Sequence, residues 1–221
     1  MKVHFIILAA LVTIAIPAVC AAAPPRPGPY VSGFIGVSAT QNTNVTSYDY
    51  IAGNSFADRV EFDPGINIGG TAGFDYGFIR LEGELSYKYG EIATITDQTR
   101  STRLHNADGN LGALAVMFNA FLDLHNDSPV TPYVGGGIGF ASMHLSDTFV
   151  SEYGLIYQED DDSVFAYQVG AGLEIALNQR LSLDLGYRYF ATTKAKFGTD
   201  NITADLKLQS HNAAIGLRVK F

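Results

Sequence analysis

The chain has 221 residues, of which 47% are hydrophobic and only 16% charged, with no tryptophan and one cysteine. This length provides one domain with a sizeable core, and the single Cys20 excludes a disulfide within the chain. The formal net charge of −8 argues against a nucleic-acid partner, because phosphate binding needs clustered lysines and arginines.

The N-terminus has the pattern of an export signal. Lys2 is followed by an apolar run over residues 5–16 and by small residues up to position 23. This order is typical of a secretory signal peptide, so we expect residues 1–22 to be removed. The apolar run is shorter than the roughly 20 residues of a spanning helix, which leaves an anchor helix as the weaker alternative. A lipidated Cys20 is a second weaker alternative, because the residues before it match a lipoprotein signal poorly. Four prolines then make residues 23–29 a stiff leader.

From Tyr30 onward, runs of about ten residues alternate between apolar and polar side chains. The alternation is clearest in the segments 79–88, 165–175, 181–189 and 213–221, and weaker in 30–40, 65–76, 109–122 and 132–143. Transmembrane β-strands have this pattern, with apolar side chains toward lipid and polar ones toward the interior. We therefore predict an all-β fold over residues 30–221, an eight-stranded antiparallel up-and-down transmembrane barrel. The alternation leaves the register of the first and fourth segments open.

The connections between these segments alternate between long and short. The long ones are 41–64, 91–108, 145–163 and 194–205, and the short ones are 76–77, 125–131 and 178–179. Bacterial outer-membrane barrels have long external loops and short periplasmic turns. We therefore expect an integral protein of the outer membrane of a Gram-negative bacterium, with both termini in the periplasm and the long connections as extracellular loops.

Charged side chains recur at the inward positions of this alternation. They are Asp75, Arg80, Glu82, Glu84, Lys88, Glu174, Asp184, Arg188, Arg218 and Lys220. The interior of an eight-stranded barrel is only wide enough to be filled by side chains or to hold one small ligand. Because isolated buried ions are very costly, we expect these charges to pair and to plug the lumen. A selectivity lining or a proton path is the alternative.

Tyrosine and phenylalanine gather at the ends of the predicted strands. Tyr30, Tyr76, Phe78 and Tyr133 lie beside the short turns, and Tyr87, Tyr89, Phe165, Tyr187 and Tyr189 lie at the opposite ends. Aromatic rings favour the boundary between lipid and water. We therefore expect these residues to form two aromatic girdles.

The polar residues give little support to catalysis or metal binding. Ser210 and His211 are sequence neighbours on the last predicted strand, and such neighbours point to opposite faces, so they cannot act together as nucleophile and base. The acidic run 159–162 supplies oxygen ligands of the kind that divalent cations prefer, but its spacing matches no calcium loop. We expect a solvated loop there, and no enzyme activity, metal or cofactor.

Four segments resemble a known family: 131–139 (TPYVGGGIG), 165–172 (FAYQVGAG), 183–189 (LDLGYRY) and 215–221 (IGLRVKF). The chain resembles the small outer-membrane β-barrel proteins, which include the transmembrane domain of outer-membrane protein A, the opacity proteins and bacterial surface antigens. The likeness covers essentially all of residues 30–221. It is specific for fold and compartment but weak for activity, because members of the family do different jobs.

The resemblance implies partners in the envelope. It implies contact with outer-membrane lipid and lipopolysaccharide. It also implies that the barrel-assembly machinery reads a C-terminal signal formed by Ile215, Leu217, Val219 and Phe221. A plain girdle role for Phe221 is the alternative. Because the sequence stops at Phe221, we expect no soluble peptidoglycan-holding domain like that of outer-membrane protein A.

These observations favour a structural and surface-display role, in envelope integrity and as a surface antigen. A narrow porin-like channel for small solutes and an adhesin that binds through its extracellular loops are the alternatives. The sequence names no extracellular ligand.

Overall fold

A computed structural model of the chain describes residues 27–49, 54–97, 102–105, 107–124, 128–146, 148–150, 154–157, 160–199 and 202–221. The predicted signal peptide and residues 23–26 of the predicted leader lie outside these ranges. None of the described residues belong to a helix that is long and apolar enough to span a membrane.

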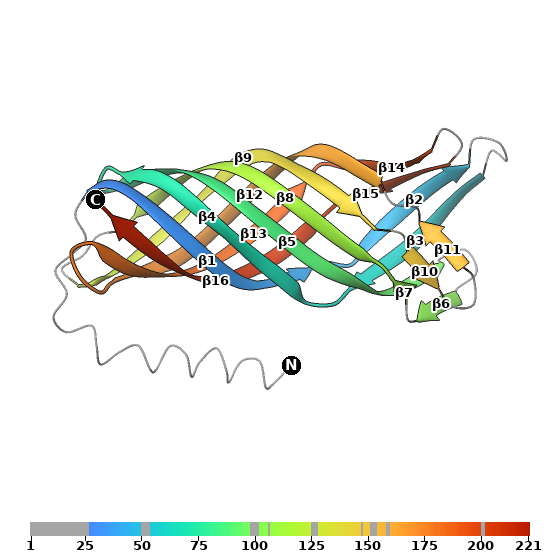
Figure 1. Ribbon diagram of the computed structural model, residues 1–221. Helices are drawn as coiled ribbons and strands as arrows, with labels where there is room; N and C mark the ends of the chain where they lie inside the picture. Colours follow the sequence, from blue (N-terminus) through green and yellow to red (C-terminus); the bar gives the residue numbers. More distant parts are fainter. Residues whose placement is uncertain are drawn as a thin grey trace.

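Eight antiparallel strands form a closed ring (Figure 1). They are β1 (Gly28–Thr40), β4 (Gly65–Asp75), β5 (Ile79–Asp97), β8 (Asn110–Asp123), β9 (Val130–Leu145), β12 (Asp160–Ala176), β13 (Leu181–Thr192) and β16 (Gln209–Lys220). Each strand pairs with the next in this order, and β16 pairs with β1, so no strand edge is left open. The predicted eight-stranded up-and-down barrel is therefore confirmed.

Alternation along each strand separates a lipid-facing wall from a filled interior. On β4, Ile66 and Ile68 are exposed on the outside while Asn67 and Thr71 are buried inside, because successive side chains of a strand point to opposite faces.

The structure also settles the register of β8, which is apolar on both faces. Leu114, Val116 and Phe118 face outward and are exposed, whereas Ala115 and Met117 are buried in the lumen.

The barrel wall continues beyond the ring as shorter strands. These are β2 (Thr43–Asp49), β3 (Asn54–Phe62), β14 (Ala195–Thr199) and β15 (Ile202–Leu206), with β6 (Thr102–His105), β7 (Ala107–Asp108), β10 (Thr148–Val150) and β11 (Gly154–Tyr157) beside them. Each strand pairs with the next in the order β14, β15, β2, β3 and residues 92–97 of β5. All of them lie at the end of the barrel opposite to the C-terminus (Figure 1). The four long connections of the predicted barrel are thus gathered at one end, and in their described parts they are largely built of strands.

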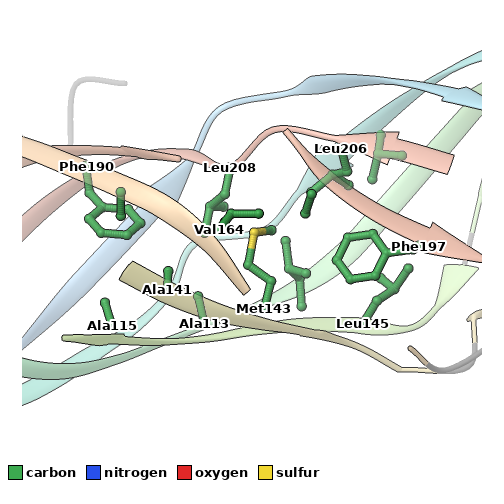
Figure 2. Close-up of a cluster of buried hydrophobic side chains, with 14 of the residues drawn as sticks. Ala113, Ala115, Ala141, Met143, Leu145, Val164, Phe190, Phe197, Leu206 and Leu208 are labelled. Carbon is green, nitrogen blue, oxygen red and sulfur yellow. The ribbon is translucent and has the colours of Figure 1, made fainter. Parts of the chain in front are cut away.

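A physical reason for the extension lies in its core. One cluster of buried apolar residues, drawn in part in Figure 2, consists of Val45, Val60, Ile92, Ile95, Leu111, Ala113, Ala115, Met117, Ala141, Met143, Leu145, Val164, Ala166, Phe190, Ala195, Phe197, Leu206 and Leu208. This cluster extends from the extension into the adjoining half of the ring. Val45 on β2, Val60 on β3 and Phe197 on β14 belong to this cluster, and their burial stabilises the strands of the extension.

Candidate functional site

The inside of the ring holds a network of charged side chains and, farther from the C-terminus, part of the apolar cluster. The structure places the side chains of all ten predicted lumen charges inside the barrel. Nine of them lie in the half nearer the C-terminus, and Lys88 pairs in register with Ala113 of the apolar cluster. Asp184 and Arg188 retain 13% and 18% side-chain exposure, and the other eight residues are more completely buried. Buried charges at this density require partners.

At the C-terminal end of the lumen, two cations are held by three carboxylates. Lys220 Nζ lies 2.8 Å from Asp75 Oδ2 and 3.2 Å from Glu174 Oε1. Arg218 donates to Glu174 and, at 2.6 Å, to Asp184 Oδ2. Glu174 thus bridges the two cations, which joins β4, β12, β13 and β16 across the barrel.

Arg80 is buried between aromatic rings at the same end. Its guanidinium carbon lies 5.0 Å from the ring centroid of Phe121 and 4.6 Å from that of Tyr133. Its Nη2 lies 3.3 Å from Asp123 Oδ1. Asp123 is absent from the predicted set because the register of its strand was open. With it, six acidic and five basic side chains share the lumen.

The middle of the lumen is organised around Glu84. Arg188 donates to Glu84 and lies 3.4 Å from Glu82 Oε1. The side-chain amides of Asn119 and Gln168 donate to Glu84 Oε2 at 2.9 and 2.8 Å. These two neutral residues are absent from the predicted set: Gln168 stands at an inward position of its alternation, whereas Asn119 lies on β8, whose register the sequence leaves open. Together the donors satisfy a carboxylate that would otherwise be buried without a partner.

Lys88 marks the limit of the charged half. Its ammonium group donates to Ser86 Oγ at 2.9 Å and lies 4.2 Å from the ring centroid of Phe190. Phe190 itself belongs to the apolar cluster (Figure 2). This cation–π contact joins the charged network to the apolar cluster.

Two of the predicted girdle tyrosines lie inside the barrel, so this part of the prediction is wrong. The hydroxyl of Tyr30 donates to Glu82 Oε2 at 2.5 Å, and that of Tyr133 to Asp184 Oδ1 at 2.7 Å. Both occupy inward positions of their strands and are almost fully buried, and a buried phenol needs a hydrogen-bond partner. The other predicted girdle residues are on outward-facing positions: Tyr76, Phe78, Tyr87, Tyr89, Phe165, Tyr187 and Tyr189.

A small cavity remains on the β1, β4, β13 and β16 side of the lumen. Its volume is about 20 Å³, and its lining includes Asn67, Asn212 and Arg218. Asn67 Oδ1, Asn212 Oδ1 and Arg218 Nε make no hydrogen bond to another described residue. This volume accommodates roughly one water molecule, far less than a hydrated ion needs.

The Ser–His pair and the acidic cation site considered from the sequence are not assembled by the described residues. Ser210 is buried in the lumen whereas His211 lies on the outer wall, as strand alternation predicts. Asp161 pairs with His144 at 2.8 Å, and Asp162 accepts a backbone hydrogen bond from Lys196. No three metal-ligating side chains of the described part of the chain form a cluster. Glu159 of the acidic run lies outside it.

The predicted assembly signal occupies the outer face of β16. Ile215, Leu217, Val219 and Phe221 are all exposed on the lipid-facing wall. The backbone N–H of Phe221 donates to the carbonyl of Pro29 at 3.1 Å, which fastens the end of the chain to the start of β1.

Comparison with known proteins places the chain in a family. The model of the family described as "Outer membrane protein beta-barrel domain" matches residues 6–221. The chain belongs to this family. Outer membrane protein PagN of Salmonella typhimurium is 26% identical over 91% of this chain and 93% of its own. As a member of the outer membrane protein beta-barrel family, the chain is an integral protein of the Gram-negative outer membrane.

Solved structures agree on the fold. Neisserial surface protein A aligns with a TM-score of 0.51 at 19% identity, over 88% of this chain and 97% of its own. OprG of Pseudomonas aeruginosa aligns with a TM-score of 0.58 at 12% identity, over 91% and 100%. At these identities the likeness concerns the barrel of the family alone.

Proposed function

We propose that this protein is a non-conducting barrel that contributes to envelope integrity and displays a rigid surface structure outside the cell. The observation that carries the proposal is the double closure of the lumen. The salt-bridge network fills the half of the ring nearer the C-terminus. In the other half the apolar cluster packs along β8, β9 and β12, beside buried polar side chains such as Ser38, Lys88 and Ser210. An ion that crossed the barrel would have to break the first layer and lose its hydration shell in the second.

The extension supports the display role. β5 has 19 residues and β12 has 17, whereas a barrel strand crosses a membrane with about 9–11. The excess lies in the part of the wall that has its own hydrophobic core, with Val60, Phe197 and Leu206 among its buried residues. A packed core holds the hairpins in fixed positions, which suits a surface antigen or a binding platform.

Single-channel recording tests the closure. The folded protein, checked by a heat-dependent gel shift, is expected to be silent in a planar bilayer in concentrated KCl. Because the two layers lie in series, we expect the single variants Arg188→Ala and Phe190→Ala to stay silent, and only the double variant to conduct. Reproducible steps from the wild type would favour the alternative of a narrow porin-like channel for small solutes.

Adhesion through the extension is the remaining alternative, and the tips of the hairpins test it. Replacing residues 50–53 and 151–153 by short Gly-Ser turns leaves every buried residue of the apolar cluster in place. Deletion of all residues 41–64 is unsuitable for this test, because it would remove Val45 and Val60 from the apolar cluster. Loss of host-cell binding in these two variants would support an adhesin. Unchanged binding would rule out adhesion through these connections.

Assembly and processing are part of the same proposal. The outward alternation that ends at Phe221 supports recognition by the barrel-assembly machinery, and Phe221→Ser should lower the yield of heat-modifiable protein in the outer membrane. Val31→Ser, on the neighbouring strand, is the control, because it also lies on the exposed lipid-facing wall. N-terminal sequencing of the exported protein tests the removal of residues 1–22.

A further inference from the structure

Three neighbouring strands change from apolar to polar outward side chains at one level of the barrel. On β16 the alternation of apolar residues over 213–221 ends at His211, and on β1 the alternation over 31–39 ends at Gln41. His211 pairs directly with Ala39 on β1 and with Tyr189 on β13. An apolar run of nine residues matches the length of a membrane-crossing strand. This level, at the end of the ring joined to the extension, is therefore the outer boundary of the membrane.

Five side chains at this level form an ordered group, the boundary cluster: Gln41, Tyr187, Tyr189, Gln209 and His211. The His211 ring stacks on Tyr187 at 6.0 Å and lies 5.3 Å from the ring of Tyr189. Its Nε2 lies 2.6 Å from the amide nitrogen of Gln41, and its Nδ1 lies 2.6 Å from the hydroxyl of Tyr187. The amide of Gln209 donates to the hydroxyl of Tyr189 at 2.6 Å.

These contacts orient two hydroxyl groups toward the outside. When the Gln41 amide donates to Nε2 of the neutral His211 ring, the proton on Nδ1 donates to the oxygen of Tyr187. Tyr189 likewise accepts from Gln209. Each phenol therefore serves the cluster as an acceptor and keeps its own hydrogen for a further acceptor. Two aromatic faces and two donors are thus held in place at the membrane boundary.

The adjoining wall, formed by β9 and β12, has a different character. On β9 and β12, Phe140 and Phe165 pack edge to face at 6.1 Å and are both exposed. That pair offers only an apolar surface, as expected for a general aromatic girdle. The boundary cluster is thus a local feature of the β13–β16–β1 wall.

Cations lie directly beyond the cluster. Lys207 shares its outward face with Gln209 two residues along the chain, and Lys196 is exposed on the neighbouring β14. Lys194 is 67% exposed, with its Nζ 3.6 Å from Asp205 Oδ2. In a chain of net charge −8, these three lysines concentrate positive charge at this wall, where Asp205 contacts Lys194 and Asp162 accepts from the backbone of Lys196.

We infer that the boundary cluster and Lys207 bind the phosphorylated sugar headgroup of a glycolipid in the outer leaflet. The aromatic rings offer flat faces to the sugar ring, and the two phenols and the amides supply donors and acceptors for its hydroxyl groups. The lysines supply positive charge for its phosphates. A phospholipid with a small headgroup can use the charge but not the aromatic and amide surface.

Binding is measured on the full folded chain in neutral detergent micelles, by native mass spectrometry. The probes are lipopolysaccharide, dephosphorylated lipopolysaccharide and phosphatidylglycerol. We expect lipopolysaccharide to bind most tightly, and the double variant Tyr187→Phe/Tyr189→Phe, which keeps both rings, to weaken it about tenfold or more. Tyr87→Phe, on the outer wall of β5, is the matched control and should bind like the wild type.

Lys207→Gln separates phosphate from sugar recognition. This variant should weaken the binding of lipopolysaccharide but not that of the dephosphorylated form. Equal affinity for phosphatidylglycerol and lipopolysaccharide would overturn the proposal, as would unchanged binding in the double tyrosine variant. Because the cluster lies outside the lumen, these results do not depend on whether the barrel conducts.

Discussion

The Tyr133 hydroxyl donates a 2.7 Å hydrogen bond to Asp184 Oδ1 inside the barrel. The same ring lies against the guanidinium of Arg80 and within reach of the backbone at Gly172. Tyr133 therefore connects three parts of the lumen: a carboxylate of β13, a cation of β5 and the open space that a glycine leaves on β12. It is a structural member of the charge network.

Tyr133→Phe removes only the donor of this bond. Asp184 keeps its contact with Arg218 but loses one hydrogen bond, so we expect the free energy of unfolding to fall by about 1–3 kcal/mol. Urea unfolding of the protein in lipid vesicles measures the change. Tyr76→Phe, at an exposed position, is the control and should leave the stability unchanged. An equal loss in both variants would contradict a specific role for the Tyr133 hydroxyl.

Gly172 provides the space for the Tyr133 ring. A Cβ atom at this position would lie 2.4 Å from the Tyr133 hydroxyl oxygen and 2.4 Å from the carbonyl oxygen of Leu185. Gly172→Ala should therefore destabilise the barrel by about 1–3 kcal/mol, the usual cost of overpacking. Gly33→Ala is a matched control on the outer wall, because a Cβ there meets nothing within 4 Å. The two variants are compared by the temperature at which the folded band disappears on a gel, and similar temperatures would contradict the packing argument.

Arg80 and Asp123 should be energetically coupled. Both are almost fully buried, with Nη2 and Oδ1 3.3 Å apart, and removing one partner of a buried ion pair costs about 3–5 kcal/mol. We expect Arg80→Met to lose an amount of this size, and Arg80→Met/Asp123→Leu to lose less than the sum of the two single variants. The measurement is a double-mutant cycle of unfolding free energies in vesicles. Additive losses would show that the two charges act independently.

The strands and the inward charges could be predicted from the sequence because both follow from a period of two. Glu82, Glu84 and Arg188 stand in clear alternations, so their direction was fixed before any pairing was known. β8 has apolar residues on both faces, and its register, together with the role of Asp123, needed the pairing of β8 with β5 and β9. The inward apolar residues of β8, such as Ala115 and Met117, belong to the apolar cluster, so a strand that is apolar on both faces is the pattern that indicates an apolar region of the lumen.

Tyr30 and Tyr133 stand at inward positions of their strands, so the alternation directs them into the lumen, where buried carboxylates accept from their hydroxyls. The expected girdle positions rested on their location at strand ends, which does not distinguish the lipid face from the lumen. The strands of the extension lie in segments that the length of the connections marks as loops. They are strands because their inward faces, such as Val45 and Val60, share one core.

Depth in the membrane gives the last test. Leu185 faces outward on β13, between Leu181 at the start of the strand and Tyr189 at the outer boundary. An arginine on the lipid face costs about 2–4 kcal/mol at the midplane and about 0–1 kcal/mol near an interface. We therefore expect Leu185→Arg to lower the stability and yield of the folded barrel strongly, and Leu181→Arg to do so only slightly. Both are measured as the folded fraction after refolding into vesicles of one lipid. Equal losses would mean that the short turn beside Leu181 does not lie at the interface, and a yield of Leu185→Arg like that of the wild type would place Leu185 away from the midplane.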